Sequence, residues 1–172
     1  TCAALALALF ARRMEKLEVD SRYADTVERV IYNGFLSGLS LDGKSFFYEN
    51  AQEIDLEERR IVKEALRDTS YIHYPITQRL EVFNCSCCPP NVTRFIASIG
   101  DFIYNYDDET IYVNQYMDST AKLGGLTLVQ KTDYPFDGRI EFTLTGGNRR
   151  VALRIPGWCR VWSVGKNGAS CG

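Results

Sequence analysis

The sequence predicts an α+β protein, with helices in the first two thirds of the chain and strands in the last third. Apolar residues recur at helical spacing from Cys2 to about Leu17 and again from Ser21 to about Leu36. After Asp107-Asp108 the pattern changes to short β-rich runs separated by turn residues. We therefore expect two parts, an α-helical one over residues 1–108 and an antiparallel β one over residues 109–172.

The first two helices are expected to form an antiparallel hairpin. The apolar positions expected in the first helix are Leu5, Phe10, Met14 and Leu17. Asp20-Ser21 supplies a plausible N-cap for the second helix. The apolar face expected in this second helix comprises Val27, Val30, Ile31 and Phe35. The short polar link between the two stretches is typical of an αα-hairpin.

The middle of the chain combines short extended pieces with helical ones. We expect a short aromatic strand at Ser45–Tyr48, a charged helix or long loop over 52–68, and an extended piece at Arg79–Phe83. Two prolines, Pro89 and Pro90, are expected to prevent helix before a third helix from Val92 to about Tyr104. The apolar stripe expected in this helix comprises Phe95, Ile96, Ile99 and Phe102.

Four segments in the last third have strand length and β-rich composition. They are Thr110–Tyr116, Leu126–Lys131, Arg139–Thr145 and Arg150–Ile155. Gly-Gly, Pro-Phe-Asp-Gly and Gly-Gly-Asn turn signals separate them. This pattern predicts antiparallel strands.

Charge and hydropathy exclude two classes of partner. The chain has 20 basic and 22 acidic residues, a net charge of −2, and no basic block, which argues against nucleic acid. No run approaches the roughly 18 to 20 apolar residues of a membrane span. We expect a cytoplasmic protein, because clustered thiols fit a reducing compartment, while secretion or periplasmic export stays open.

Three of the six cysteines carry the functional prediction. Cys87 and Cys88 are adjacent and cannot easily bridge each other, and Cys2 opens the first helix. Thiolates are soft metal ligands and strong nucleophiles, so these residues are candidate zinc ligands. The alternative is that cysteines are inert and packed as small hydrophobes, which is the expectation for Cys159 and Cys171.

At this point the residues resemble a known family. The run CSCCPPNVTR at residues 85–94 is similar to the CxCCPPNxxR signature of glycoside hydrolase family 127, the β-L-arabinofuranosidases. Thr1-Cys2-Ala3 resembles the end of that family's Glu-Thr-Cys-Ala motif. Further matching segments lie in the same order at residues 22–34, 42–50 and 153–159. The resemblance implies a fragment of an (α/α)6 barrel, here its C-terminal part, followed by the first antiparallel strands of a β-sandwich.

The resemblance also implies a mechanism. Zinc would be held by Cys2, Cys87 and Cys88 together with a glutamate, and Cys87 would be the nucleophile of a retaining hydrolase that removes β-L-arabinofuranosyl units. The glutamate ligand and the acid/base glutamate would precede Thr1. We therefore expect the chain by itself to be inactive, with weak zinc binding. The resemblance implies a carbohydrate substrate, and a homodimer of the full-length protein is compatible with it.

Four other residues receive predictions. Glu28 shares a helical face with apolar residues, so its carboxylate is a candidate substrate contact; the alternative is an ordinary glutamate paired with an arginine. Tyr48 is a candidate sugar contact or a core residue. His73, the one histidine, is expected in a loop, and Asn91 and Arg94 are expected to brace the motif loop.

Two further interpretations stay open at this stage. One is a non-catalytic module in which Cys2, Cys87 and Cys88 form a structural zinc site that supports carbohydrate or protein binding. The other is a secreted module held together by disulfides. Accessibility of Cys87 to a sugar-like electrophile separates the first alternative from an enzyme, and counting free thiols tests the second.

Overall fold

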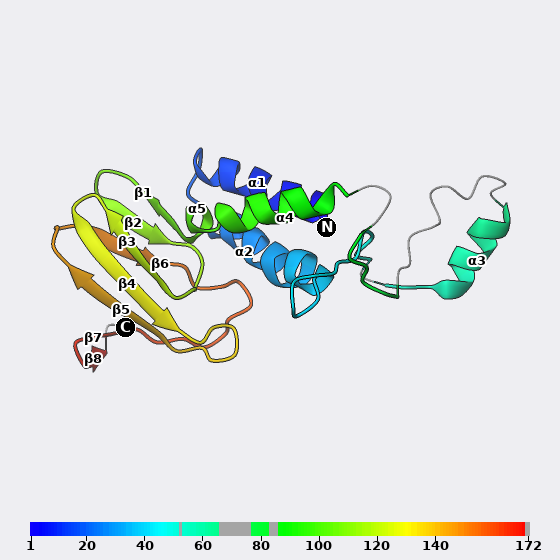
Figure 1. Cartoon of the computed structure of the whole chain (residues 1–172). Coiled ribbons are helices and arrows are strands. Elements are labelled where there is room, and N and C mark those ends of the chain that lie inside the picture. Colours follow the sequence, from blue (N-terminus) through cyan, green and yellow to red (C-terminus); the bar gives the residue numbers. More distant parts are fainter. Residues whose placement is uncertain (52, 66–76, 83–85, 171–172) are drawn as a thin grey trace. The chain divides into compact units, whose positions relative to one another are not determined.

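The computed structural model describes residues 1–51, 53–65, 77–82 and 86–170. It divides into two compact units (Figure 1). Unit 1 comprises Thr1–Leu9 and Arg29–Ala97, and unit 2 comprises Phe10–Glu28 and Ser98–Gly172. Both helices and antiparallel strands are present, which confirms the α+β class. The origin of the helices in an (α/α)6 barrel stays a prediction.

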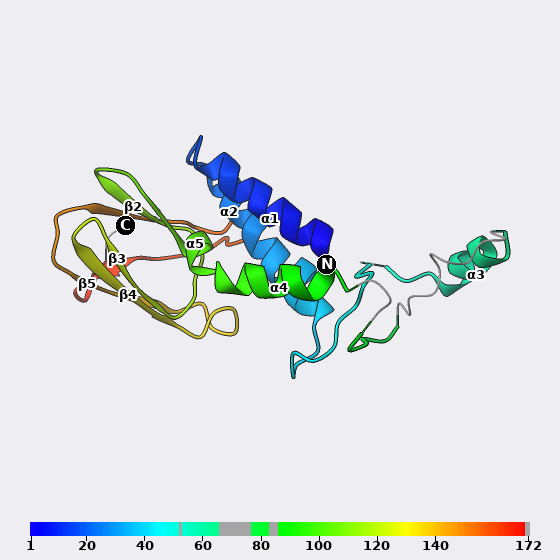
Figure 2. The same ribbon diagram turned by 45° about the horizontal axis from the view of Figure 1, so that its top comes forward.

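Unit 1 is helical and packs around a small apolar core. Its helical elements are the start of α1 (Cys2–Glu15), a π-helix (Val30–Phe35), a 3-10 turn (Leu36–Gly38), α3 (Leu56–Ala65) and α4 (Cys88–Ala97), seen from two directions in Figures 1 and 2. The rings of Phe35 and Phe95 meet edge to face with their centroids 5.2 Å apart. Gly34 lies where an added Cβ would be 2.9 Å from the Cβ of Ala4, so glycine permits this close approach of the two segments.

The buried face of α1 differs from the predicted one. Leu5 is buried as expected, but Phe10 is 60% exposed and Leu17, beyond the end of the helix, is 81% exposed. The positions buried instead are Leu5, Ala8, Ala11 and Glu15. Large apolar residues at near-helical spacing suggested the wrong face, because small alanines fit closely packed helix surfaces without standing out in an apolar pattern.

The second predicted helix is confirmed with a change of geometry near its end. α2 (Ser21–Arg29) begins after Asp20, whose Oδ1 accepts a hydrogen bond from the backbone N–H of Arg22 at 2.8 Å. The chain then continues as the π-helix from Val30 to Phe35. The predicted apolar face is buried at Val27, Val30, Ile31 and Phe35.

The elements around the cysteine motif need two corrections. α4 begins at Cys88 rather than at Val92, so Pro89 and Pro90 lie in its first turn. Prolines are tolerated there because the first backbone N–H groups of a helix have no intrahelical partner. Ser45–Tyr48 is not a strand: Phe46 forms only isolated bridges, to Leu39 and Leu80.

Unit 2 contains two three-stranded sheets. The first has the order β1 (Tyr104–Tyr106), β2 (Thr110–Val113), β6 (Arg150–Leu153), and the second has the order β3 (Ser119–Leu123), β4 (Leu126–Thr132), β5 (Ile140–Thr145). A short hairpin, β7 (Gly165–Lys166) and β8 (Ala169–Ser170), follows. Both sheets contribute to one core, whose buried members are Ile111, Val113, Tyr116, Leu126 and Leu128. The sheets therefore pack face to face, as in a sandwich.

All four predicted strand segments contain strands, but one pairing and one boundary were predicted wrongly. β2 pairs with β6 in parallel, with Ile111 opposite Val151, whereas only antiparallel strands were expected. The chain between them forms the second sheet, and such a long connection allows parallel pairing. Tyr104–Tyr106 is strand β1, not the end of the third helix, which stops with the short α5 (Gly100–Ile103).

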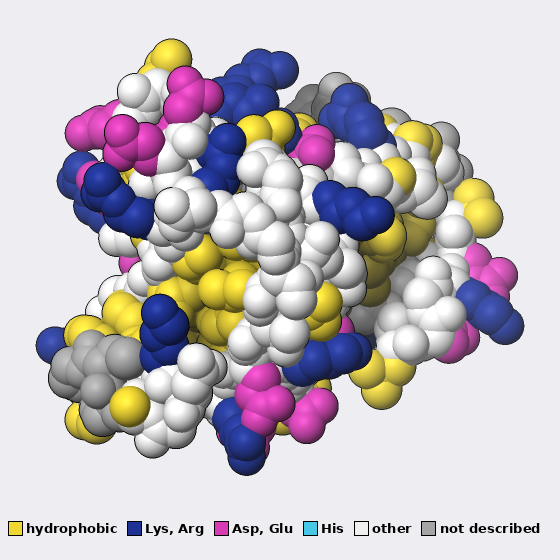
Figure 3. All heavy atoms as spheres, turned by 90° about the vertical axis from the view of Figure 1, so that its left-hand side faces the viewer, with side chains coloured by type: hydrophobic (Ala, Val, Ile, Leu, Met, Phe, Trp, Pro, Cys, Tyr) yellow, Lys and Arg dark blue, Asp and Glu magenta, His cyan; other side chains and the backbone are white. Residues whose placement is uncertain are grey.

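The surface is mixed in charge. On the face shown in Figure 3, Lys and Arg side chains alternate with Asp and Glu side chains, in keeping with the net charge of −2. Among the residues that the structure describes, no helix has the length and apolar character of a membrane span.

Candidate metal-thiolate site

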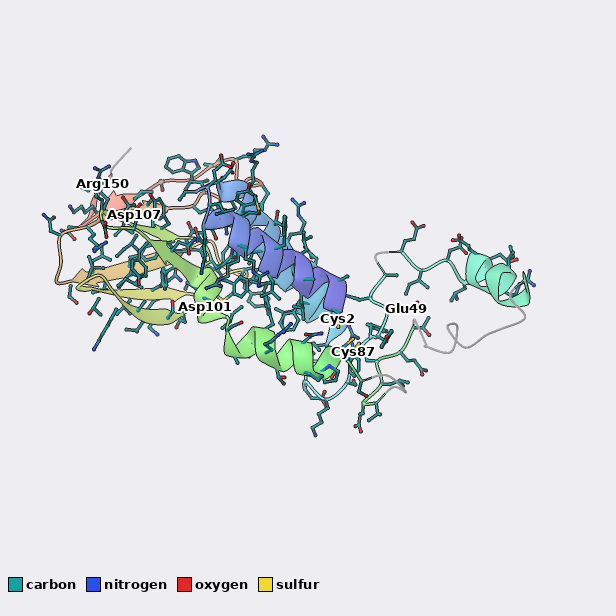
Figure 4. The ribbon with its side chains drawn as sticks, turned by 90° about the horizontal axis from the view of Figure 1, so that it is seen from above. Cys2, Glu49, Cys87, Asp101, Asp107 and Arg150 are labelled. Carbon is teal, nitrogen blue, oxygen red and sulfur yellow. The ribbon has the colours of Figure 1, made fainter. Side chains whose placement is uncertain are left out.

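Three cysteine side chains from distant parts of the sequence meet in unit 1. Cys2 is the first residue of α1, Cys88 is the first residue of α4, and Cys87 directly precedes α4. The Sγ of Cys2 lies 3.9 Å from the Sγ of Cys87 and 3.7 Å from the Sγ of Cys88. All three sulfurs lie within 4.8 Å of one another, and Figure 4 shows Cys2 and Cys87 next to each other.

These separations fit a shared metal ion. A Zn–S bond of about 2.3 Å and tetrahedral angles place two sulfur ligands of one zinc ion about 3.8 Å apart. The two measured sulfur separations from Cys2, 3.7 and 3.9 Å, bracket that value. Cys2, Cys87 and Cys88 can therefore supply three ligands to one ion, and a four-coordinate site would take one more ligand.

Asn91 braces the cluster from the first turns of α4. Its side-chain Nδ2 donates to the Sγ of Cys2 at 3.1 Å and to the carbonyl oxygen of Cys87 at 3.3 Å. Arg94 in turn donates to the Oδ1 of Asn91 at 2.8 Å, which fixes the orientation of the amide. The predicted bracing role of Asn91 and Arg94 is confirmed by these contacts.

Burial and hydrogen bonding separate the thiols electrostatically. Burial alone would raise the pKa of Cys2, but hydrogen bonds from the Asn91 amide and the neighbouring thiols outweigh it and lower that pKa. Cys88 is buried, and desolvation together with the neighbouring Cys2 thiolate raises its pKa to about 12. Cys87 is the exposed member of the three. Without a metal, Cys88 is thus a thiol, and Cys87 is the sulfur that an external electrophile reaches.

Tyr48 lies beside the thiols and also belongs to a small core. Its hydroxyl is 4.0 Å from the Sγ of Cys87. The same residue packs against the buried pair Phe46 and Cys88. Both predicted environments, sugar contact and core packing, are thus compatible with its position, and its binding role stays a prediction.

Glu28 lies in unit 2, where a buried ion network surrounds it. Its Oε2 pairs with Arg154, and its Oε1 accepts a hydrogen bond from Trp158 Nε1 at 2.8 Å. Arg154 also pairs with Asp25 at 2.5 Å and donates to the carbonyl oxygen of Asn114. Glu28 is thus buried and paired with an arginine, rather than lying on the surface, and its substrate-binding role stays a prediction.

Sequence reasoning missed the arginine that organises this network. Arg154 stands 126 positions after Glu28, and no local pattern links them. The signal that could have been used is a lone arginine inside a β-rich run, between Leu153 and Ile155. The candidate residues Cys85, His73 and Cys171 lie outside the described residues.

Comparison with known proteins follows the same division of the chain. Residues 1–101 match the family model of the β-L-arabinofuranosidase GH127 catalytic domain, and residues 110–171 match the model of the GH127 middle domain. Helices that bring three thiols together, followed by paired sheets, thus define parts of two domains of a glycoside hydrolase. The chain belongs to the β-L-arabinofuranosidase family GH127.

Individual relatives agree with this assignment. A non-reducing end β-L-arabinofuranosidase of Bifidobacterium longum subsp. longum is 38% identical over 169 residues, which cover 93% of this chain and 24% of that protein. The crystal structure of a GH127 β-L-arabinofuranosidase from Geobacillus stearothermophilus T6 superposes with a TM-score of 0.82 at 39% identity, covering 99% of this chain and 27% of that one. A second GH127 β-arabinofuranosidase structure gives 0.73 at 36% identity over 91% of this chain and 23% of that one. The chain thus spans about a quarter of these relatives.

Proposed function

We propose that this chain is part of a retaining glycoside hydrolase that removes β-L-arabinofuranosyl units with Cys87 as the nucleophile. The observation that carries the proposal is the meeting of three thiols within 4.8 Å in a chain of this family. Zinc is the proposed cofactor, held by Cys2, Cys87 and Cys88. When bound, it would keep the sulfurs deprotonated near neutral pH.

Differences in exposure favour Cys87 over its neighbours as the nucleophile. Cys88 is buried and has a pKa of about 12, and Cys2 is partly covered. Cys87 is exposed, with the Tyr48 hydroxyl 4.0 Å from its sulfur. A sugar carbon can approach this sulfur with the least displacement of protein atoms, so Cys87 is the candidate for attack.

The proposed reaction has two displacements. The sulfur of Cys87 forms a bond to the anomeric carbon while the bond to the leaving oxygen breaks, and an acid outside the described residues gives that oxygen a proton. Water, deprotonated by the same group, then displaces the sulfur from the opposite side. Two inversions retain the configuration, as in other retaining glycosidases.

Two further residues are proposed to contact the sugar. Tyr48 would direct its hydroxyl toward the sugar beside Cys87. Glu28 would need to use further acceptor positions, because an ionised carboxylate has about four and its described partners occupy two. We also propose a cytoplasmic location, because the chemistry needs reduced thiols, and four cysteines in the described part are unpaired.

A structural zinc site in a non-catalytic module is the second candidate. The burial of Cys88 and the hydrogen bond from Asn91 to Cys2 favour it, because sulfurs shielded in this way are typical of closed sites. The two candidates differ in one property. A catalytic site leaves one sulfur open to a substrate, and a structural site does not.

A cysteine-directed trap distinguishes the candidates. The longer gene product that contains these residues would be incubated with an arabinofuranose analogue bearing a haloacetamide at its anomeric position, and the labelled peptide identified by mass spectrometry. We expect stoichiometric labelling at Cys87, abolished by Cys87→Ala and unaffected by Cys159→Ala, a matched change at a thiol of unit 2. Labelling shared equally by Cys87 and Cys159, or absent from both, would favour the structural site.

A further inference from the structure

The two tryptophans of the chain, Trp158 and Trp162, both lie in one irregular segment after β6 and are both more than half exposed. Exposed apolar residues are common and need no explanation singly. The two rings differ, however, in how they are held. Trp158 is fixed by contacts on its edge and its face, whereas no hydrogen bond or ring stack is recorded for Trp162 within the described part of the chain.

The edge of the Trp158 indole is clamped by the buried ion network. Its Nε1 donates to Glu28 at 2.8 Å, and Glu28 is itself held by Arg154, whose side chain is 2% exposed. The preceding turn is fixed as well, because the backbone N–H of Gly157 donates to the Oδ2 of Asp25 at 3.1 Å. A surface ring is thus oriented by charges in the interior of unit 2.

One face of the ring continues an aromatic series that begins in the core. The buried Tyr116 meets Tyr134 edge to face at 5.7 Å, and Tyr134 stacks on Trp158 at 6.5 Å with an angle of 22° between the planes. Trp158, at the outer end of this series, remains 63% exposed. The series therefore supports the ring from within the protein and leaves indole surface in solvent.

We infer that Trp158 is a sugar-stacking plate, on which the C–H face of a carbohydrate ring packs against the indole. Three observations favour a sugar over an unspecific apolar partner. The ring is pre-organised, which reduces the entropy that binding would cost. A carboxylate accepting from Nε1–H increases the negative charge of the indole face, which complements the slightly positive C–H groups of a sugar. The chain also belongs to a family of carbohydrate-active enzymes.

In this inference Glu28 and Arg154 act as positioning residues for the ring. Glu28→Gln keeps an oxygen that accepts from the indole but removes the negative charge and the ion pair with Arg154. The inference goes beyond the proposed function, since it needs neither zinc nor the Cys87 thiolate. Sugar binding at Trp158 and thiol chemistry at Cys87 can each fail without the other.

Fluorine NMR of the gene product containing these residues, labelled with 5-fluorotryptophan, tests the inference. Trp158→Phe and Trp162→Phe assign the two resonances by their disappearance. On titration with L-arabinose we expect a saturable shift of the Trp158 resonance and none of the Trp162 resonance. In Glu28→Gln the affinity should fall by about two- to tenfold, the range of a single aromatic contact. Cys87→Ala should leave the titration unchanged.

Several outcomes would overturn the inference. They are the absence of a saturable Trp158 shift in the unsubstituted protein, an equal shift of Trp162, or a larger response to tetramethylammonium than to L-arabinose. Dependence of the Trp158 resonance on protein concentration, without a response to sugar, would assign the ring to contacts between copies. The titration of the unsubstituted protein decides the matter even where a variant fails to fold.

Discussion

Arg154 offers the sharpest test of how unit 2 is held together. Its guanidinium pairs with Asp25 and Glu28, and the exposed fractions of the three side chains are 2%, 23% and 9%. Arg154→Met would leave a similar volume but no positive charge, so Glu28 would stay buried without a counter-ion. Breaking a buried ion pair from one side costs about 3–5 kcal/mol. We expect the free energy of unfolding of unit 2 to fall by about that amount.

Two matched variants give this prediction its control. Arg150 lies four residues earlier, in the same strand, and pairs with Glu109 at 3.1 Å, but these side chains are 78% and 73% exposed. Arg150→Met should therefore cost less than about 1 kcal/mol. Arg154→Met combined with Glu28→Gln should recover part of the loss, because the uncompensated charge is removed.

The assay is urea denaturation followed by hydrogen exchange of backbone amides in β2 and β6, which reports on unit 2 directly. In Arg154→Met the protected amides of both strands should exchange at lower urea than in Arg150→Met. Equal shifts for the two variants would refute the reasoning. So would a double variant no more stable than Arg154→Met alone.

Three further predictions follow from single contacts. Burial raises the pKa of Glu15 to about 7 from the ordinary 4.5, so its stabilising contribution is full below pH 4.5 and is lost as the pH rises through 7; Glu15→Gln should flatten this decline in thermal unfolding between pH 4.5 and 8. Phe95→Ala should reduce the free energy of unfolding by about 3–5 kcal/mol in denaturant melts, and Ile96→Ala, on the exposed side of α4, by no more than about 0.5 kcal/mol. Asn91→Ala should slow alkylation of Cys2 by iodoacetamide at pH 8 in chelator-treated protein, since the amide that lowers the pKa of Cys2 is lost; an unchanged rate would show that Asn91 does not hold this thiol.

Local patterns predicted those parts of the fold that depend on local physics. The face of Val27, Val30, Ile31 and Phe35 was predicted correctly because apolar spacing decides which side of a helix is buried. The strands containing Leu126–Lys131 and Arg139–Thr145 were predicted because glycine and proline turns bound them. These features need no knowledge of distant residues.

The failures are all non-local. The parallel pairing of β2 with β6 depends on where the chain returns after a second sheet, which no short window contains. The buried stripe of α1 depends on a close helix neighbour that accepts only alanine. Arg154 meets Glu28 across 126 positions. At the candidate site the resemblance named Cys2, Cys87 and Cys88, and the structure added the distances, the brace by Asn91 and the difference in burial.

X-ray absorption at the zinc edge, on the gene product containing these residues, tests the central claim most directly. If Cys2, Cys87 and Cys88 hold one ion, the spectrum should show three sulfurs at about 2.3 Å and one lighter ligand. Each of Cys2→Ser, Cys87→Ser and Cys88→Ser should lower the sulfur number by one or abolish binding, and Cys159→Ser should change nothing. A zinc ion without sulfur ligands, or a spectrum indifferent to all three substitutions, would contradict the account.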